Sequence, residues 1–273
     1  MPKIRIRGAE LHYEDVGTGP ETIVFSHGLL FSTRMFDKQV EAFKGRYRCF
    51  SYDHRGQGQS ETTASGYDMD TLTDDAIALI EHFKLGPVHF VGLSMGGFVG
   101  MRMAARRPDL VKSLAVLETS AEPEPEKNVP KYRMLAFIGR TFGLGLVANR
   151  VMKIMFSQTF LNDPSRTQER EHWKKVLSGL DMKGVSKALD GVITRKPVLD
   201  ELAKIRVPTL VGVGDEDVAT VPAKAQRIHE GIPGSRLVII KGAGHSSTHE
   251  QPDAVNAELE KHFSESRAKS GAA

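Results

Sequence analysis

Apolar runs of strand length alternate with helix-like segments over the first part of the chain. The runs with few polar interruptions lie at 21–28, 47–53, 87–94 and 111–119. Between them, residues 70–84 repeat apolar side chains with the period of a helix, at Leu72, Ala76, Leu79, Ile80 and Phe83. Strands that are apolar on both faces and are separated by helices pair in parallel and are covered on both sides. The pattern therefore predicts an α/β fold with a mostly parallel sheet and helices on both faces.

The alternation is interrupted once, in the middle of the chain. A stretch rich in proline and charge is followed by a segment that is mainly helical and rich in Met and Phe. Apolar runs at 207–214 and 235–242 then resume the strand pattern. We therefore expect a core built from residues 1–121 and 201–273, with residues 122–200 inserted as a helical cap.

Composition and charge exclude several classes of protein. The chain has 273 residues, of which 40% are hydrophobic and 26% are charged, which is typical of a globular protein and not of a disordered or coiled-coil one. The net charge of +3 comes from interspersed basic and acidic residues, so no nucleic-acid partner is expected. Arg140 and Arg150 interrupt the most apolar later stretch, so no membrane span is expected. The lone Cys49 and the absence of an apolar leader at the N-terminus favour the cytoplasm.

One serine lies in a pattern that is typical of a nucleophile. Gly92-Leu93-Ser94-Met95-Gly96 joins an apolar strand to a helix, and G-x-S-x-G in that context forms a strained turn that exposes the serine hydroxyl. Side chains two positions before and after the serine would collide there, so glycine is required. We predict Ser94 as the nucleophile. The Met95 N–H at the start of the helix is the first predicted donor of an oxyanion hole.

A serine nucleophile needs a histidine to accept its proton. His245 follows the run at 235–242 and lies where loops leave the carboxyl ends of strands, the edge at which catalytic groups gather in such sheets. His249, four residues later, is the alternative. Five other histidines fall on helical or surface-like stretches and are expected to be solvated: His12, His82, His172, His229 and His262.

A carboxylate should orient the histidine, and a second N–H should complete the oxyanion hole. Asp215, Glu216 and Asp217 all follow the run at 207–214, and the chain order of serine, acid and histidine does not choose among them. The loop after the run at 21–28 supplies the Leu29 N–H as the second donor. His27 is expected to brace that loop.

Five motifs together resemble the α/β-hydrolase superfamily: SHGLL, YDHRGQGQS, GLSMGG, GDEDVATVP and GAGHSSTHEQP. The chain is most similar to its 3-oxoadipate enol-lactonase-like and haloperoxidase/arylesterase-like serine hydrolases. The resemblance implies an eight-stranded sheet with an inserted cap whose Met and Phe residues roof an apolar acyl pocket. It also assigns the triad acid to Asp217, with Asp215 as the alternative.

The expected activity is hydrolysis of a small carboxylic ester through an acyl-enzyme, with Ser94, His245 and Asp217 as the triad. A lactonase, a perhydrolase or an acyltransferase would use the same groups, and an acidic lactone would need a cation such as Arg34, Arg133 or Arg140. A ligand-sensing receptor that keeps the hydrolase fold is the alternative from another class. No cofactor is expected, because DHRGQGQS lacks the third glycine of a dinucleotide loop. No metal is expected, because no Cys/His cluster has metal-ligand spacing.

Overall fold

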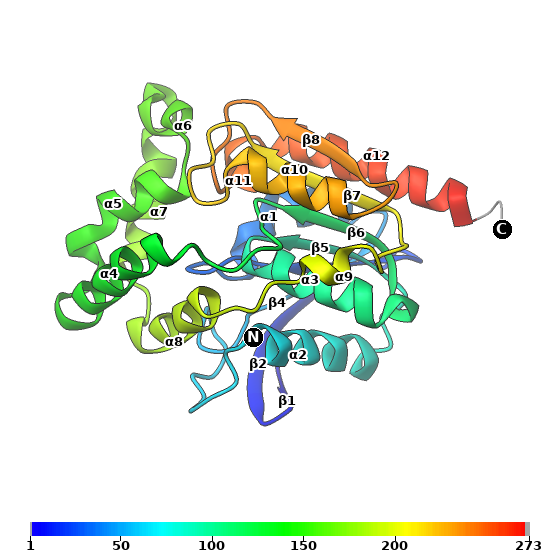
Figure 1. Cartoon of the computed structure of the whole chain (residues 1–273), viewed down its shortest axis with the longest axis horizontal. Helices are drawn as coiled ribbons and strands as arrows, with labels where there is room; N and C mark the ends of the chain where they lie inside the picture. Colours follow the sequence, from blue (N-terminus) through cyan, green and yellow to red (C-terminus); the bar gives the residue numbers. More distant parts are fainter. Residues whose placement is uncertain (1, 271–273) are drawn as a thin grey trace.

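Eight strands form one sheet in the order β1-β2-β4-β3-β5-β6-β7-β8 (Figure 1). The computed structural model describes residues 2–270. The strands are β1 (Lys3–Ile6), β2 (Ala9–Val16), β3 (Thr22–Ser26), β4 (Arg48–Tyr52), β5 (Val88–Leu93), β6 (Val111–Leu117), β7 (Thr209–Gly214) and β8 (Arg236–Ile240). Neighbouring strands along the part of the sheet ordered β4-β3-β5-β6-β7-β8 are parallel. The other two pairs, β1 with β2 and β2 with β4, are antiparallel. The predicted eight-stranded, mostly parallel sheet is confirmed.

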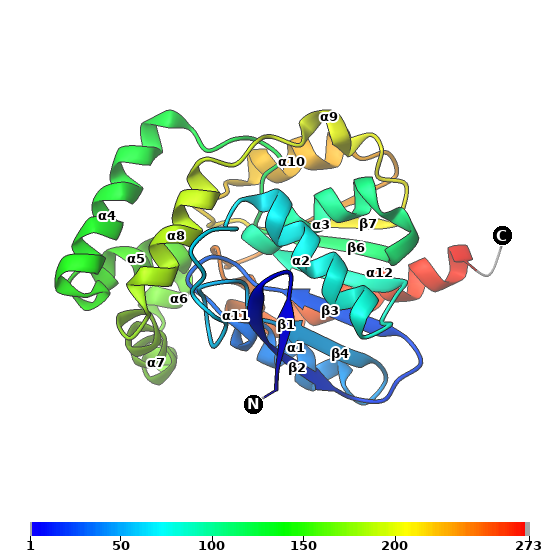
Figure 2. The ribbon, with the colours of Figure 1, turned by 90° about the horizontal axis from the view of Figure 1, so that it is seen from below.

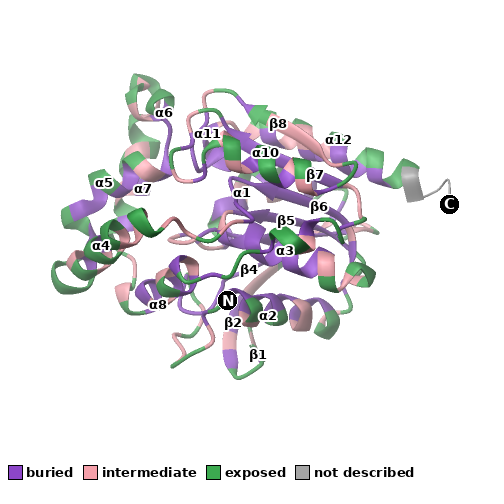
Figure 3. Ribbon diagram, viewed as in Figure 1, coloured by how far each residue is buried: buried purple, intermediate pink, exposed green. Residues whose placement is uncertain are grey.

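Helices cover both faces of this sheet. On one face lie α1 (Asp37–Phe43), α11 (Ser247–Glu250) and α12 (Pro252–Ser270). On the other lie α2 (Met69–His82), α3 (Met95–Arg106), α9 (Leu199–Leu202) and α10 (Pro222–Gly231). Every residue of β3, β5 and β7 is buried, and Figure 3 shows the strands enclosed between the two helical layers. Cys49 is buried in β4, as its apolar run predicts.

The chain between β6 and β7 forms a separate group of helices. They are α4 (Val129–Phe142), α5 (Ala148–Met155), α6 (Gln158–Asn162), α7 (Thr167–Ser178) and α8 (Met182–Ile193), with short 3-10 turns at Glu126–Asn128, Leu144–Val147 and Pro164–Arg166. Figures 1 and 2 both show these helices together at one end of the sheet. Side chains of α4, α5 and α8 share a cavity with Ser94, so this group covers the carboxyl ends of the strands. Within residues 2–270, no helix combines the length and apolarity that a membrane span requires.

Candidate active site

Ser94 lies at the tight turn between β5 and α3. Its backbone has φ 53° and ψ −110°, a conformation that L residues adopt only under constraint. A Cβ on Gly96 would fall against the carbonyl oxygen of Ser26, and one on Gly92 would fall against the carbonyl oxygen of Gly96. The two glycines therefore allow β3, β5 and α3 to approach closely enough to form the turn.

We expect Gly96→Ala to lower the free energy of unfolding by about 3 kcal/mol or more, because the added methyl group collides with backbone that cannot move aside. Gly45→Ala is the matched control, since a Cβ at that position meets no atom within 4 Å. It should change stability by no more than about 0.5 kcal/mol. Urea unfolding of both variants measures the difference. Equal stabilities would contradict the steric account of the turn.

Ser94, His245 and Asp217 form one hydrogen-bonded line. Ser94 Oγ lies 2.9 Å from His245 Nε2, and His245 Nδ1 lies 2.9 Å from Asp217 Oδ2. Because an ionised carboxylate only accepts hydrogen bonds, the Nδ1–H donates to Asp217 and Nε2 is left to accept from the serine hydroxyl. Thr220 supports the carboxylate through its N–H at 3.0 Å and its hydroxyl at 2.7 Å.

The negative charge of the Asp217 carboxylate is stabilised by His245 and Thr220. Burial raises the pKa of Asp217, but the charge and the hydrogen bond of His245, with the hydrogen bonds of Thr220, outweigh burial and bring the pKa below its usual value. Asp217 is therefore ionised near neutral pH. It can hold the imidazole in one tautomer and stabilise a positive charge on the ring.

The neighbouring acids and the alternative histidine have other partners. Asp215 accepts a hydrogen bond from the Gly242 N–H at 2.7 Å, and Glu216 accepts from the N–H of Thr159 at 3.0 Å. His249 Nε2 lies 3.0 Å from the carbonyl oxygen of Arg34, and burial lowers the pKa of His249 to about 4. Of the three candidate acids, Asp217 is the one that contacts His245.

The two predicted oxyanion donors flank Ser94. Met95 is the first residue of α3, so its N–H has no acceptor within the helix. Leu29 lines the same cavity as Ser94 and His245, and its N–H donates to no acceptor in the described residues 2–270. The next residue, Leu30, has φ 73°, so this loop also contains constrained backbone.

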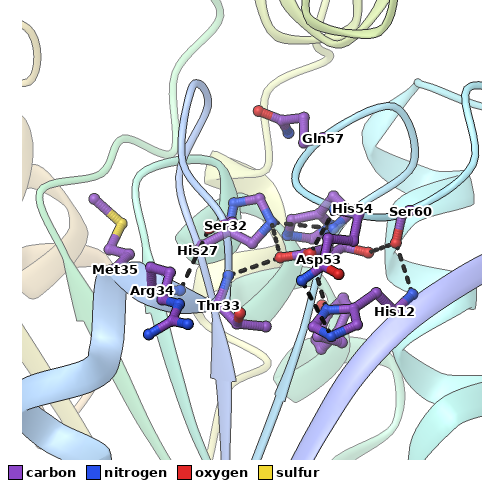
Figure 4. A network of polar contacts seen from close by, with 12 residues as sticks. His12, His27, Ser32, Thr33, Arg34, Met35, Asp53, His54, Gln57 and Ser60 are labelled. Carbon is purple, nitrogen blue, oxygen red and sulfur yellow. Dashed lines mark hydrogen bonds and ion pairs between the residues drawn. The ribbon is translucent and has the colours of Figure 1, made fainter. Parts of the chain in front are cut away.

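A buried polar network fixes the loop that carries Leu29 (Figure 4). His27 Nδ1 lies 2.7 Å from the carbonyl oxygen of Gly28, and His27 Nε2 accepts from the N–H of His54 at 3.1 Å. Burial lowers the pKa of His27, so its ring is neutral and has one donor and one acceptor, as these two contacts require. His27 thus braces the loop, as expected.

Asp53 links the same loop to two other segments (Figure 4). Its carboxylate accepts from the N–H of Thr33 at 2.7 Å and from the N–H of Gln59 at 2.8 Å, and lies 3.0 Å from His12 Nδ1. The expectation that His12 and His262 are solvated is wrong, because both are buried. For His12 the reason is its Asp53 partner, which compensates for the burial of a polar ring.

Gln57 was missed by the sequence reasoning. Its Oε1 accepts from the Leu30 N–H at 2.8 Å, and its Nε2 lies 3.9 Å from Met95 Sδ, so one buried side chain joins the loop that carries Leu29 to the first residue of α3. Gln57 lies in DHRGQGQS, a segment that contributes to the family resemblance and lacks the third glycine of a dinucleotide loop, but the sequence alone gives Gln57 no role at the site. The available signal was the position of that segment directly after β4, at the same edge of the sheet as the predicted triad residues.

A cavity of about 130 Å³ opens beside Ser94. Residues 122–200 contain eight Met and Phe residues, which the resemblance placed in the pocket roof, and two of them, Met155 and Met182, line the cavity. The others do not: Met134, Phe137 and Phe142 are exposed, and Met152, Phe156 and Phe160 are buried in a hydrophobic cluster. Helix-level patterns cannot tell which face of an inserted helix meets the core, which accounts for these errors.

The cation in the cavity wall is also not one of those named from the sequence. Arg133 and Arg140 are exposed, and Arg34 lies on a separate surface groove with Trp173. Arg195 lines the cavity instead. It follows α8, on the segment that leads back to β7. Across residues 2–270, no group of three or more His, Cys, Asp or Glu side chains is arranged to hold a metal ion.

Comparisons with known proteins point to one family. The family model described as alpha/beta hydrolase fold matches residues 21–252. The 3-oxoadipate enol-lactonase 2 of Acinetobacter baylyi is 29% identical over 252 residues, covering 92% of this chain and 91% of its own. A non-heme haloperoxidase of Rhodococcus erythropolis is 29% identical over 273 residues, covering 92% and 95%. Among solved structures, a thermophilic esterase from Thermogutta terrifontis has a TM-score of 0.88 at 28% identity and covers 97% of this chain and 99% of its own.

Proposed function

The chain belongs to the alpha/beta hydrolase fold family, and from that premise we propose that it is a serine hydrolase that cleaves small carboxylic esters through an acyl-enzyme. The membership bears out the resemblance drawn from the five sequence motifs and supports a hydrolase activity. The observation that carries the proposal is the line of hydrogen bonds from Ser94 Oγ through His245 to Asp217, beside a largely apolar cavity.

In the proposed reaction, Ser94 Oγ attacks the ester carbonyl carbon while His245 Nε2 takes its proton. The N–H groups of Leu29 and Met95 stabilise the oxyanion, an effect typically worth several kcal/mol. His245 returns the proton to the leaving alcohol, and an acyl group remains on Ser94. His245 then activates a water molecule, which attacks the acyl-enzyme and releases the carboxylic acid. Asp217 holds the ring and stabilises its charge in both halves.

The inserted helices are proposed to bind the acyl group. We propose residues 122–200 as the cap and residues 1–121 and 201–273 as the catalytic core. Cavity-lining side chains from α4, α5 and α8 support this division, because they lie in one continuous insertion. The apolar wall favours a hydrocarbon acyl chain over a strongly polar acyl chain, since burying apolar surface contributes about 25 cal/mol per Å².

The test is a panel of p-nitrophenyl esters with short acyl chains, run alongside a fluorophosphonate probe that labels activated serines. We expect rapid multiple turnover and labelling of one residue, Ser94. Lactones and peroxide are included in the panel, because the enol-lactonase and haloperoxidase relatives make lactonase or perhydrolase activity the second candidate. Very slow turnover together with ligand-dependent binding of a partner would instead favour the receptor alternative.

Gln57→Ala should lower kcat about 10-fold while KM changes little, because the N–H donors act mainly on the charge that develops in the transition state. Gln57 contacts both the loop that carries Leu29 and the side chain of Met95. Gln226→Ala, on the surface of α10, is the control and should leave both constants unchanged. A rise in KM with constant kcat would show that Gln57 acts on substrate binding instead.

A further inference from the structure

One charged pair is enclosed in the wall of the cavity beside Ser94. Arg195 Nη1 lies 3.0 Å from Glu124 Oε2, and the two side chains are only 2% and 8% exposed. Both residues line the cavity, whose other side chains are largely apolar. A pair in this position is costly to bury unless its hydrogen bonds are satisfied, so its remaining donors and acceptors need partners.

The Arg195 guanidinium is held in one orientation. Nε donates to the carbonyl oxygen of Glu122 at 3.0 Å, and Nη1 also donates to the carbonyl oxygen of Val192 at 2.8 Å. The guanidinium carbon lies 4.4 Å from the centre of the Phe98 ring, so the planar group is stacked as well as hydrogen-bonded. Such a fixed planar group loses little entropy when it forms a further hydrogen bond.

The third nitrogen of this group is available to a ligand. Among residues 2–270, Nη2 donates to no acceptor, and it is not one of the fully enclosed side-chain atoms that lack a partner. Because Arg195 lines the cavity, Nη2 is the part of the guanidinium that is left to face it. A substrate oxygen that accepts from Nη2 would form a hydrogen bond to a charged donor, which is stronger than one between neutral groups, in a largely apolar cavity.

The charges around Arg195 are balanced, and this balance favours an uncharged substrate oxygen over a carboxylate oxygen as the acceptor for Nη2. Glu124 already neutralises Arg195, and Glu122 is paired with Arg227. Lys224 is a further cation close enough to interact electrostatically with the same two acids and with Asp217. A substrate carboxylate would therefore bring surplus negative charge close to Glu124 in a poorly solvated site. An uncharged carbonyl, amide or ether oxygen would accept from Nη2 without that penalty.

We propose that Arg195 determines acyl specificity by donating a hydrogen bond to an uncharged oxygen of the substrate, and that the preferred substrates are neutral oxo-acyl esters or lactones and not acid-ended ones. The inference rests on the proposed esterase function. Arg195 and Ser94 line the same cavity, and Phe98, on which Arg195 stacks, lies about one helical turn after Ser94. The oxygen is therefore expected a few carbon atoms beyond the scissile carbonyl.

The test compares three phenyl esters of nearly equal shape, made from 4-oxopentanoic acid, 4-methylpentanoic acid and butanedioic acid, and their homologues with one more carbon. At one or both chain lengths, kcat/KM should be at least about 10-fold higher for the oxo ester than for the methyl ester, and lowest for the acid-ended ester. Apolar burial alone would favour the methyl ester. A methyl preference at both lengths, or preference for the acid-ended ester, would overturn the proposal.

Two variants assign the preference to this pair. The double variant Arg195→Met, Glu124→Gln removes both charges and should bring the oxo-to-methyl ratio to about 1. Glu124→Gln alone leaves Arg195 unneutralised and should raise the relative kcat/KM for the acid-ended ester about 10-fold. Arg140→Met, on an exposed position of α4, is the control. The assignment would be overturned if the double variant kept the wild-type ratio of kcat/KM for the oxo ester to that for the methyl ester. If the double variant does not fold, the assignment would be overturned by an unchanged relative kcat/KM for the acid-ended ester in Glu124→Gln.

Binding separates this inference from the function on which it rests. In a Ser94→Ala background the intact esters can be titrated calorimetrically, and the Kd of the oxo ester should be about 10-fold lower than that of the methyl ester. If this difference is present but the wild type hydrolyses no ester, the proposed function fails and the Arg195 site stands. If esters are hydrolysed but neither kcat/KM nor Kd distinguishes the oxo group, the Arg195 site fails and the proposed function stands.

Discussion

Ser94→Ala should abolish ester hydrolysis, with kcat falling by at least about 10⁴-fold while the fold is retained. The hydroxyl is the atom that lies 2.9 Å from His245 Nε2, and removing it leaves no nucleophile in that line. Alanine fits the space of serine, so the melting temperature should stay within about 2 °C of the wild type. The measurement is steady-state hydrolysis of p-nitrophenyl butyrate, with the fluorophosphonate adduct followed by intact-mass spectrometry.

Ser178→Ala is the control for that experiment. Ser178 is exposed at the end of α7, so its removal should change neither activity nor labelling. Full activity in Ser94→Ala, or a fluorophosphonate adduct on another residue of that variant, would contradict the assignment of the nucleophile and with it the proposed function.

Asp217→Asn should lower kcat by about 10²–10⁴-fold with little change in KM. An amide at this position presents an N–H₂ group toward the Nδ1–H of His245, so one of the two must turn away and the ring adopts the wrong tautomer. The effect is expected to be large because Asp217 Oδ2 is the acceptor at 2.9 Å from Nδ1. Comparison of kcat values between variant and wild type over a range of pH values measures it.

Asp215→Asn is the matched control, two residues away on the same loop. Asp215 accepts from the Gly242 N–H and lies 3.5 Å from Lys241, so asparagine keeps the hydrogen bond and loses only an exposed ion pair. Its activity should stay within about 3-fold of the wild type. A larger loss at Asp215 than at Asp217 would reverse the assignment of the acid.

The sheet was predictable where the strands are buried on both faces. β3, β5 and β7 are continuous apolar runs, and they appear close to the predicted ranges. β1 and β2 gave no such pattern. They form an antiparallel edge, and β2 carries charged Glu10, Glu14 and Asp15 with only partial burial. A strand that is solvated on one side carries polar residues on that side, so its sequence lacks the continuous apolar run by which the buried strands were recognised.

The candidate site was predictable where a motif implies a position at a strand end. Ser94, Asp217 and His245 follow β5, β7 and β8, and the structure brings them into contact; their catalytic roles remain predictions. The choice between Asp217 and Asp215 depends on how a short loop turns after its strand. Residue order cannot give that turn.

Arg195 and Gln57 required the three-dimensional structure. Arg195 reaches the cavity because the end of α8 packs against residues 122–124, a contact between segments about seventy residues apart in the chain. No local pattern indicates such a contact. Gln57 was not predicted for a different reason, since the glycines on either side of it drew attention to dinucleotide binding. Both cases show that the residues bracing or lining a site are specified by tertiary packing.

The division between the sheet edge and the inserted helices has a consequence for how relatives of this chain can diverge. The proposed catalytic groups lie between Leu29 and His245 on several segments, whereas much of the cavity wall comes from one uninterrupted stretch between β6 and β7. A single recombination event, or a cluster of mutations within that stretch, can therefore replace much of the proposed acyl pocket without changing the proposed reacting groups. A relative could therefore accept new substrates by changing only the stretch between β6 and β7, while the residues proposed to carry out the reaction stay the same.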